Sequence, residues 1–456
     1  MSERDFERPE EWEAEFRAMF AERSRDVRAT TSPYRAMRQR ILEARRKRRQ
    51  RIGGAGAALA VAAVGLGVWA TMSGGSQGAP PAVPVSTSAS APATPAKYVY
   101  NDGRTELPAG PLLDAAQQYL KTNYHGDLGG ATVVTTFDQA MQQAAEASKS
   151  SPNDLGLAAL DPRTGYVKAL SGPWDRPAQI ADLMKPITAA AAFETGRYSP
   201  DSNEPTNPDK HPLSWPDGSG AALQYSDSRT GQQHAWPPES GGPVRGDAFV
   251  NLREAMVKAL NTPFAQVELA SDVGLAKVYA TALAVGMPNG SPDLLQVASL
   301  TLGTAQESPL TMASVYGVFA DGGIRHDPAF VFMVKDARDK MVWQPDTTGT
   351  RVLSAHTADE VGDMLRSVLG TESVTGAPSA PALSAKGFAA MAGTADSDHA
   401  AWFDGYGADL VTAVALSRVD SNGNAAKITG GAEGGTVRGG PVLGPMWVEF
   451  MEKFGH

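Results

Sequence analysis

A stretch of 21 residues without a charged side chain, Ile52 to Met72, divides this chain of 456 residues into two unequal parts. The stretch is rich in Ala, Val, Leu and Gly, and it has the length that a helix needs to cross about 30 Å of hydrocarbon. Six basic side chains lie directly before it, within residues 45–51. Because basic residues stay on the cytoplasmic side, we expect a single-pass protein of the cell membrane, with its N-terminus in the cytoplasm and its C-terminal domain outside. A cleaved signal peptide is the alternative, although its basic leader is usually much shorter.

The segments on the two sides of this stretch differ in charge. Residues 1–51 hold 15 Lys and Arg against 10 Asp and Glu, and since the whole chain has a net charge of −9, the remainder carries about −14. Apolar residues in 9–29, among them Trp12, Phe16 and Phe20, follow helical spacing and predict a short amphipathic helix that docks on a partner or lies on lipid headgroups. Residues 73–97 are rich in Pro, Ala and Ser and predict a linker. We therefore expect a cytoplasmic tail (1–51), an anchor (52–72), a linker (73–97) and a folded domain (98–456).

Composition limits what that domain contains. The chain has no cysteine, which excludes disulfides and thiolate metal sites. Its seven histidines show no ligand spacing, so we expect no metal and no other cofactor. We also expect no nucleic acid among its partners.

Local patterns predict the first elements of the folded domain. Residues 112–124 have helical spacing, residues 131–137 have the composition of a strand, and residues 139–148 predict a second helix. The segment Asp161-Pro162-Arg163-Thr164-Gly165 separates two apolar runs, 155–160 and 166–170. Because Pro and Gly are typical turn residues, these runs predict a hairpin.

Longer phrases carry the information on family. They are QIADLMKPIT at 179–188, NLREAMVKALNT at 251–262, LGTAQESPLTMASVYGVFADGG at 302–323, MAGT at 391–394, AWFDGY at 401–406, GGTV at 434–437 and GPMW at 444–447. In this order they resemble the transpeptidase domain of penicillin-binding proteins, in particular the bifunctional (class A) members. The resemblance runs from about Thr132 to Phe450, roughly 70% of the chain. It implies an α/β fold of the α+β type, the penicillin-recognising fold, in which helices flank an antiparallel sheet.

The resemblance also implies three active-site motifs, and the first two are damaged here. In the family, Ser-x-x-Lys supplies the serine that attacks a peptide or β-lactam carbonyl, with the lysine one helical turn later easing removal of its proton. At these positions this chain has Asp182 and Lys185, and no lysine anywhere in it has a serine three residues earlier. The second motif, Ser-x-Asn, is matched by Ala259 and Asn261, so that its serine is missing as well.

The third motif has lost its charge. In the family, Lys-Thr-Gly lies on a strand that lines the site, and its lysine and threonine hold the carboxylate of the substrate. The matching residues are Met391, Ala392 and Gly393, followed by Thr394. Loss of one member of a catalytic unit can reduce a rate by about a million-fold, and such losses are not additive. Three damaged motifs therefore argue against the ordinary mechanism and give no confident catalytic residue.

The surviving residues have two interpretations. Lys185, Asn261, Gly393 and Thr394 are candidates for binding a ligand. Alternatively, Lys185 is a lysine at the surface of the cleft, paired with Asp182 at i−3, and Asp182 caps the helix. In the same structural interpretation Asn261 bonds to local backbone, and Gly393 and Thr394 serve the geometry of the strand.

An insertion, Pro205 to Arg245, contains Trp215 and Trp236. These side chains either bind a glycan or a partner, or pack the loop onto its own domain.

These features predict a membrane-anchored, penicillin-binding-protein-like domain associated with peptidoglycan assembly, a non-catalytic binding or regulatory protein. Its expected partners are a peptidoglycan precursor or muropeptide, a β-lactam held without a covalent bond, and other proteins of cell-wall synthesis. The alternative is a D,D-transpeptidase or carboxypeptidase with a non-standard nucleophile. Only about 35 residues separate the linker from the transpeptidase-like region, so we expect no glycosyltransferase domain between them.

Overall fold

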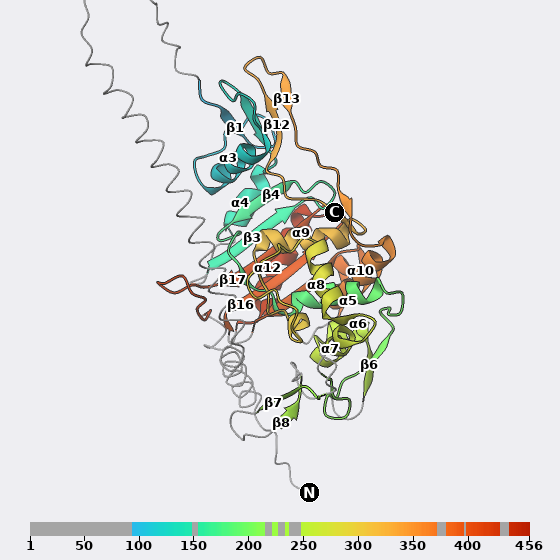
Figure 1. Ribbon diagram of the computed structural model, residues 1–456. Coiled ribbons are helices and arrows are strands. Elements are labelled where there is room, and N and C mark those ends of the chain that lie inside the picture. The colour runs from blue at the N-terminus through green and yellow to red at the C-terminus, as the bar shows by residue number, and fades with distance from the viewer. Residues whose placement is uncertain are drawn as a thin grey trace, which may run out of the picture. The chain divides into compact units, whose positions relative to one another are not determined.

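Strands that are buried along nearly their whole length build a five-stranded antiparallel sheet at the centre of the described structure (Figure 1). This computed structural model describes residues 94–147, 154–214, 221–226, 233–236, 248–371, 380–395, 398–428 and 437–456. The strand order is β15-β16-β17-β3-β4. Their bounds are β3 Asp154–Leu160, β4 Val167–Ser171, β15 Ala389–Thr394, β16 Ala400–Tyr406 and β17 Val411–Ser417. The antiparallel sheet expected from the resemblance is therefore present.

The two faces of this sheet enter different apolar clusters, because successive side chains of a strand point to opposite sides. On β16, Trp402 and Tyr406 enter one cluster while Phe403 enters the other. The first cluster includes residues of α5 (Lys185–Phe193) and α9 (Pro309–Ala320), and the second includes residues of α12 (Gly439–Phe454). Helices thus cover both faces, as predicted.

The local predictions near the start of the domain are confirmed. Helix α3 spans Pro111–Asn123, strand β2 spans Thr132–Thr135, and helix α4 spans Gln139–Ala147. Strands β3 and β4 form the expected hairpin, and Gly165 supplies its turn with a φ of 69° while its N–H donates to Asp161 O at 2.9 Å. Strands β1 (Lys97–Val99), β2, β12 (Val331–Lys335) and β13 (Met341–Trp343) form a second sheet, in that order.

The segment that leads into the first motif is held on both sides. Strand β5 (Ala178–Gln179) pairs with β10 (Gln306–Glu307), and a 3₁₀ turn, η2 (Ala181–Met184), follows it and continues into α5. Gly303, directly after η3 (Leu300–Leu302), lies so close to this turn that an added Cβ would be 1.9 Å from Ala181 O. The first motif is therefore fixed by its neighbours.

The remaining elements surround this core. They are β6 Asn203–Pro205, β7 Gln224–Ser226, β8 Gln233–Ala235, β9 Phe249–Asn251, α6 Leu252–Val257, α7 Asn261–Leu269, α8 Gly274–Ala284, β11 Ile324–Arg325, β14 Thr350–Arg351, α10 Ala355–Gly370 and α11 Pro381–Ala385. No helix within the described ranges has the length and apolar character needed to cross a bilayer. The tail, the anchor and nearly all of the linker expected from the sequence lie outside those ranges, as does Trp215.

Glu307 on β10 gives the fold a pH dependence that can be measured. Burial raises the pKa of its carboxyl from 4.5 to about 7, although a hydrogen bond with Ser291 opposes this shift. The folded protein then binds a proton that the unfolded chain has released, so stability falls as the pH rises from about 4.5 to about 7.

We predict that Glu307→Gln raises the thermal unfolding midpoint at pH 8 and leaves it nearly unchanged at pH 4.5, because glutamine has no charge to bury. Calorimetry over this pH range measures the difference. Glu452→Gln is the matched control, since Glu452 is exposed on α12. Equal effects of the two variants at pH 8 would contradict the prediction.

Candidate active site

The first two motifs meet at a buried ammonium group. Lys185 begins α5 and is 0% exposed, and its Nζ donates to Asp182 Oδ1 and, at 3.0 Å, to Asn261 Oδ1. Asp182 lies in η2, one turn before the lysine, and Asn261 is the first residue of α7. Residues separated by 76 positions in the chain are thereby brought into one cluster.

These contacts change the structural interpretation of all three residues. Lys185 is paired with Asp182, as that interpretation held, but it is buried rather than at the surface. Asp182 makes no capping bond, because its side chain turns to the lysine and the cap position is occupied by Ile180. Asn261 accepts from Lys185 instead of serving only local backbone.

The third motif lies beside this cluster on the edge strand β15. Gly393 approaches η2 so closely that an added Cβ would be 2.8 Å from Leu183 Cδ1 and 3.0 Å from Ile180 O. Thr394 Oγ1 accepts a hydrogen bond from Gly439 N at 3.1 Å. Gly393 therefore allows the close approach of strand and turn, and Thr394 connects the strand to the start of α12. We call Asp182, Lys185, Asn261, Gly393 and Thr394 the motif site.

The backbone of β15 offers a donor at its outer edge. Ala395 N donates to Ala400 O on β16 at 2.9 Å, so the N–H of Ala395 points into the sheet. Because the direction of these groups alternates along an antiparallel strand, the N–H of Thr394 points off the edge, away from β16, and the neighbouring Gly393 packs against η2.

Met391 and Ala392 contribute no polar group to the motif site. Met391 is 0% exposed and lies directly opposite Asp404 in the β15–β16 register, so their side chains share one face of the sheet. Asp404 is also 0% exposed, and neither of its carboxyl oxygens has a hydrogen-bond partner. Burial raises its pKa well above the ordinary value, which favours the uncharged acid.

Comparison with known proteins places the chain in a family. The family model described as "penicillin binding protein transpeptidase domain" matches residues 157–430. The chain belongs to the penicillin-binding protein transpeptidase family.

Relatives and solved structures agree with this assignment. Penicillin-binding protein 1A of Neisseria cinerea is 28% identical over 310 residues, which cover 65% of this chain and 35% of that protein. Penicillin-binding protein 2D of Bacillus subtilis is 26% identical and covers 78% and 49%, so the chain spans less than half of either relative. The structure of PonA1 from Mycobacterium tuberculosis gives a TM-score of 0.58 at 22% identity, covering 74% of this chain and 89% of that one. The transpeptidase domain from Eggerthella lenta gives 0.57 at 16% identity, covering 80% and 100%.

Two strained alanines mark the damaged motifs. Among the described residues, the non-glycine residues with positive φ are three aspartates together with Ala181, at 50°, and Ala259, at 51°. Ala181 directly precedes Asp182, and Ala259 lies two residues before Asn261. A left-handed alanine costs roughly 1–2 kcal/mol, and such strain persists only where the surroundings enforce it. The backbone of the motif site is therefore held by the scaffold around it.

The insertion packs beside the second motif. Trp236 is buried in a small apolar cluster with Leu213, Leu223 and Ala265, and Ala265 lies one turn after Asn261 on α7. Gln266 Nε2 also donates to His211 O at 2.8 Å. For Trp236 the structure therefore supports packing of the insertion onto its own domain rather than an exposed glycan-binding side chain.

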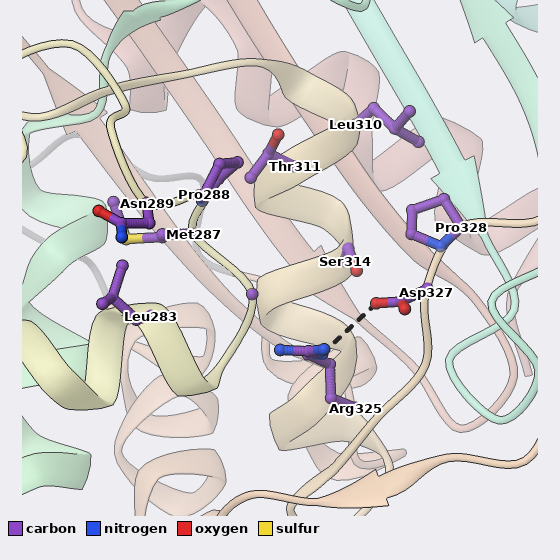
Figure 2. A pocket seen from close by; sticks show the side chains of 11 residues that line it. Leu283, Met287, Pro288, Asn289, Leu310, Thr311, Ser314, Arg325, Asp327 and Pro328 are labelled. Carbon is purple, nitrogen blue, oxygen red and sulfur yellow. Dashed lines mark ion pairs between the residues drawn. The ribbon is translucent and has the colours of Figure 1, made fainter.

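A separate cavity of about 430 Å³ lies between the end of α8 and the first half of α9, and no motif residue lines it. Figure 2 shows Arg325 and Asp327 facing each other in its wall, where Arg325 Nε is 3.4 Å from Asp327 Oδ1. Arg325 also donates from Nη1 to Ala284 O at 3.2 Å. Because this arginine already has partners within the wall, the cavity offers weaker support for a function than the motif site.

Sequence reasoning missed two buried groups behind the motif site. Tyr316 on α9 donates from its hydroxyl to Leu183 O at 3.3 Å and so connects η2 to α9. Asp404 lies within the phrase AWFDGY, which gives no sign that this residue is buried. Its position opposite Met391 could have been found by pairing that phrase with MAGT as a hairpin.

The pairing of Met391 with Asp404 generates a prediction about stability. Met391→Lys places an ammonium opposite a carboxyl that can then ionise, whereas the same change in an Asp404→Val background leaves a buried cation without a partner. Since an unpaired buried charge costs about 3–5 kcal/mol, we expect a coupling energy of about 3 kcal/mol in a double-mutant cycle measured by denaturant unfolding.

Asp404→Val by itself removes an unsatisfied carboxyl and should raise stability by about 1–3 kcal/mol. Additive effects of the two substitutions would show that residue 391 does not reach Asp404.

Proposed function

We propose that this chain is a non-catalytic member of its family that binds peptidoglycan peptides at the motif site and contributes to cell-wall assembly by binding or regulation. The observation that carries the proposal is the ion pair between Asp182 and the buried Lys185. In an active member the lysine assists a hydroxyl, and here it compensates a carboxylate.

The chemistry of aspartate supports the same conclusion. An ionised carboxylate paired with an ammonium is a weak nucleophile, and its acylation would give a mixed anhydride that water cleaves readily. Ala259 cannot replace the second serine, and Met391 brings no positive charge. Penicillin-binding protein A of Mycobacterium tuberculosis, by contrast, has been solved as a penicillin G acyl-enzyme, and PonA1 has been solved in complex with penicillin V.

We further propose that residues 52–72 anchor the chain in the cell membrane, with residues 1–51 in the cytoplasm and the folded domain outside. The support is the uncharged length of this stretch and the basic residues before it. Proteins of cell-wall synthesis are the proposed protein partners, because a folded domain on a membrane anchor is then held near that machinery.

The central test is labelling with a fluorescent penicillin. We predict that the full chain gives no covalent adduct in denaturing gels or by intact mass, because nucleophile, second serine and third-motif lysine are all missing. A band at the mass of the chain that survives denaturation would support the alternative, a transpeptidase or carboxypeptidase with a non-standard nucleophile.

A second test restores the missing groups. The substitutions Asp182→Ser, Ala259→Ser, Met391→Lys and Ala392→Thr return each motif, but Asp404 would hold the new lysine within the sheet. We therefore predict that a fifth change, Asp404→Val, raises the rate of penicillin labelling by about tenfold or more over the quadruple variant, since the new lysine then has no partner in the sheet and pairs with the carboxylate of the penicillin when it binds.

The quadruple variant is the matched control for the fifth change. Equal labelling of the quadruple and quintuple variants would contradict the assigned role of Asp404. Labelling of the variant Asp182→Ser alone would show that the missing serine is the decisive difference.

A further inference from the structure

The charges of the motif site are arranged with the negative end outward. The Lys185 side chain is 0% exposed, whereas that of Asp182 is 20% exposed. The pair is therefore a dipole whose positive end is buried and whose carboxylate faces solvent. A ligand that approaches this pair meets the anion first.

Asp182 keeps hydrogen-bonding capacity for such a ligand. The lysine donates to Oδ1, and a carboxylate has two oxygens with about four acceptor sites. The position that carries the second cation of the family is Met391, which is buried against the face that also holds Asp404. Lys185 is turned to Asp182 and Asn261, and Met391 carries no charge, so neither residue offers a cation to a carboxylate on a ligand.

The neighbouring backbone supplies the complementary contact. The N–H of Thr394 points off the edge of β15, next to η2, and a peptide carbonyl could accept from it. The site thus combines an acceptor for a cation with a donor for an amide.

We infer that the motif site selects a peptide through a free primary amine, such as the side-chain amine of a diamino acid in a wall stem peptide, and not through a terminal carboxylate. The inference rests on the proposed function, that wall peptides bind at this site. The amine donates to Asp182, and an adjacent peptide carbonyl accepts from Thr394 N–H.

The test uses four forms of one synthetic peptide, N-acetyl-L-Ala-γ-D-Glu-L-Lys-D-Ala. The lysine amine is free or acetylated, and the C-terminus is a carboxylate or a carboxamide. Calorimetric titration of the purified full chain should show that acetylation of the amine weakens binding by about tenfold or more, since a hydrogen bond to a charged group is lost. Amidation of the C-terminus should leave the affinity within about threefold, less than one such bond is worth.

Two variants distinguish loss of the hydrogen bond between the amine and Asp182 from unspecific effects of a substitution on peptide binding. Asp182→Asn keeps an oxygen for Lys185 and should remove the preference for the free amine while binding of the acetylated peptide persists. Arg438→Gln is the control, because Arg438 is exposed and precedes Gly439, which contacts Thr394. It should leave the amine preference unchanged. Thermal unfolding of each variant verifies that it is folded before titration.

The outcomes distinguish the inference from the function on which it rests. Binding that depends on the carboxylate and is lost in Arg438→Gln would overturn the inference and leave the proposed function intact. No binding of any of the four peptides would overturn both.

Discussion

The buried ammonium of Lys185 is the group on which the motif site depends. An ammonium inside a protein needs a counter-charge or several strong acceptors, because its desolvation costs several kcal/mol. Asp182 supplies the charge from one turn earlier, and Asn261 supplies a second acceptor from another helix. A serine at position 182 would give the lysine a weaker partner and a reactive one. The aspartate therefore forms a stable ion pair at the position where the family places its nucleophile.

The scaffold around this pair holds it through close backbone contacts. Gly303 and Gly393 allow η2 to be enclosed from two sides, and the Tyr316 hydroxyl supports it through Leu183 O. Ala181 and Ala259 remain in the left-handed region although neither is glycine. Such conformations persist only where surrounding contacts determine them.

Sequence patterns predicted the elements whose signals are local. The Pro and Gly of residues 161–165 indicated the β3–β4 hairpin, and helical spacing indicated α3 and α4 to within about two residues. The depth of Lys185 was not expected, because lysine is almost never fully buried unless it is paired, although all nine residues of α5 are buried. The environment of Asp404 depends on the register of two strands, which a phrase-by-phrase comparison does not give. The motif residues were found by family resemblance, and their contacts required the three-dimensional structure.

The residues that differ from the family motifs at this site are coupled to their neighbours, so the effect of changing one depends on the others. Returning serine at 182 alone leaves the buried lysine with Asn261 and a hydroxyl, so the pair loses its counter-charge before acylation is restored. Returning lysine at 391 alone puts a second cation opposite Asp404, where ionisation of that carboxyl holds the lysine in the sheet. Interacting residues of this kind have non-additive effects on both stability and rate. Each single substitution toward the motifs of the family is thus opposed by a neighbouring residue, and this coupling stabilises the present arrangement of side chains.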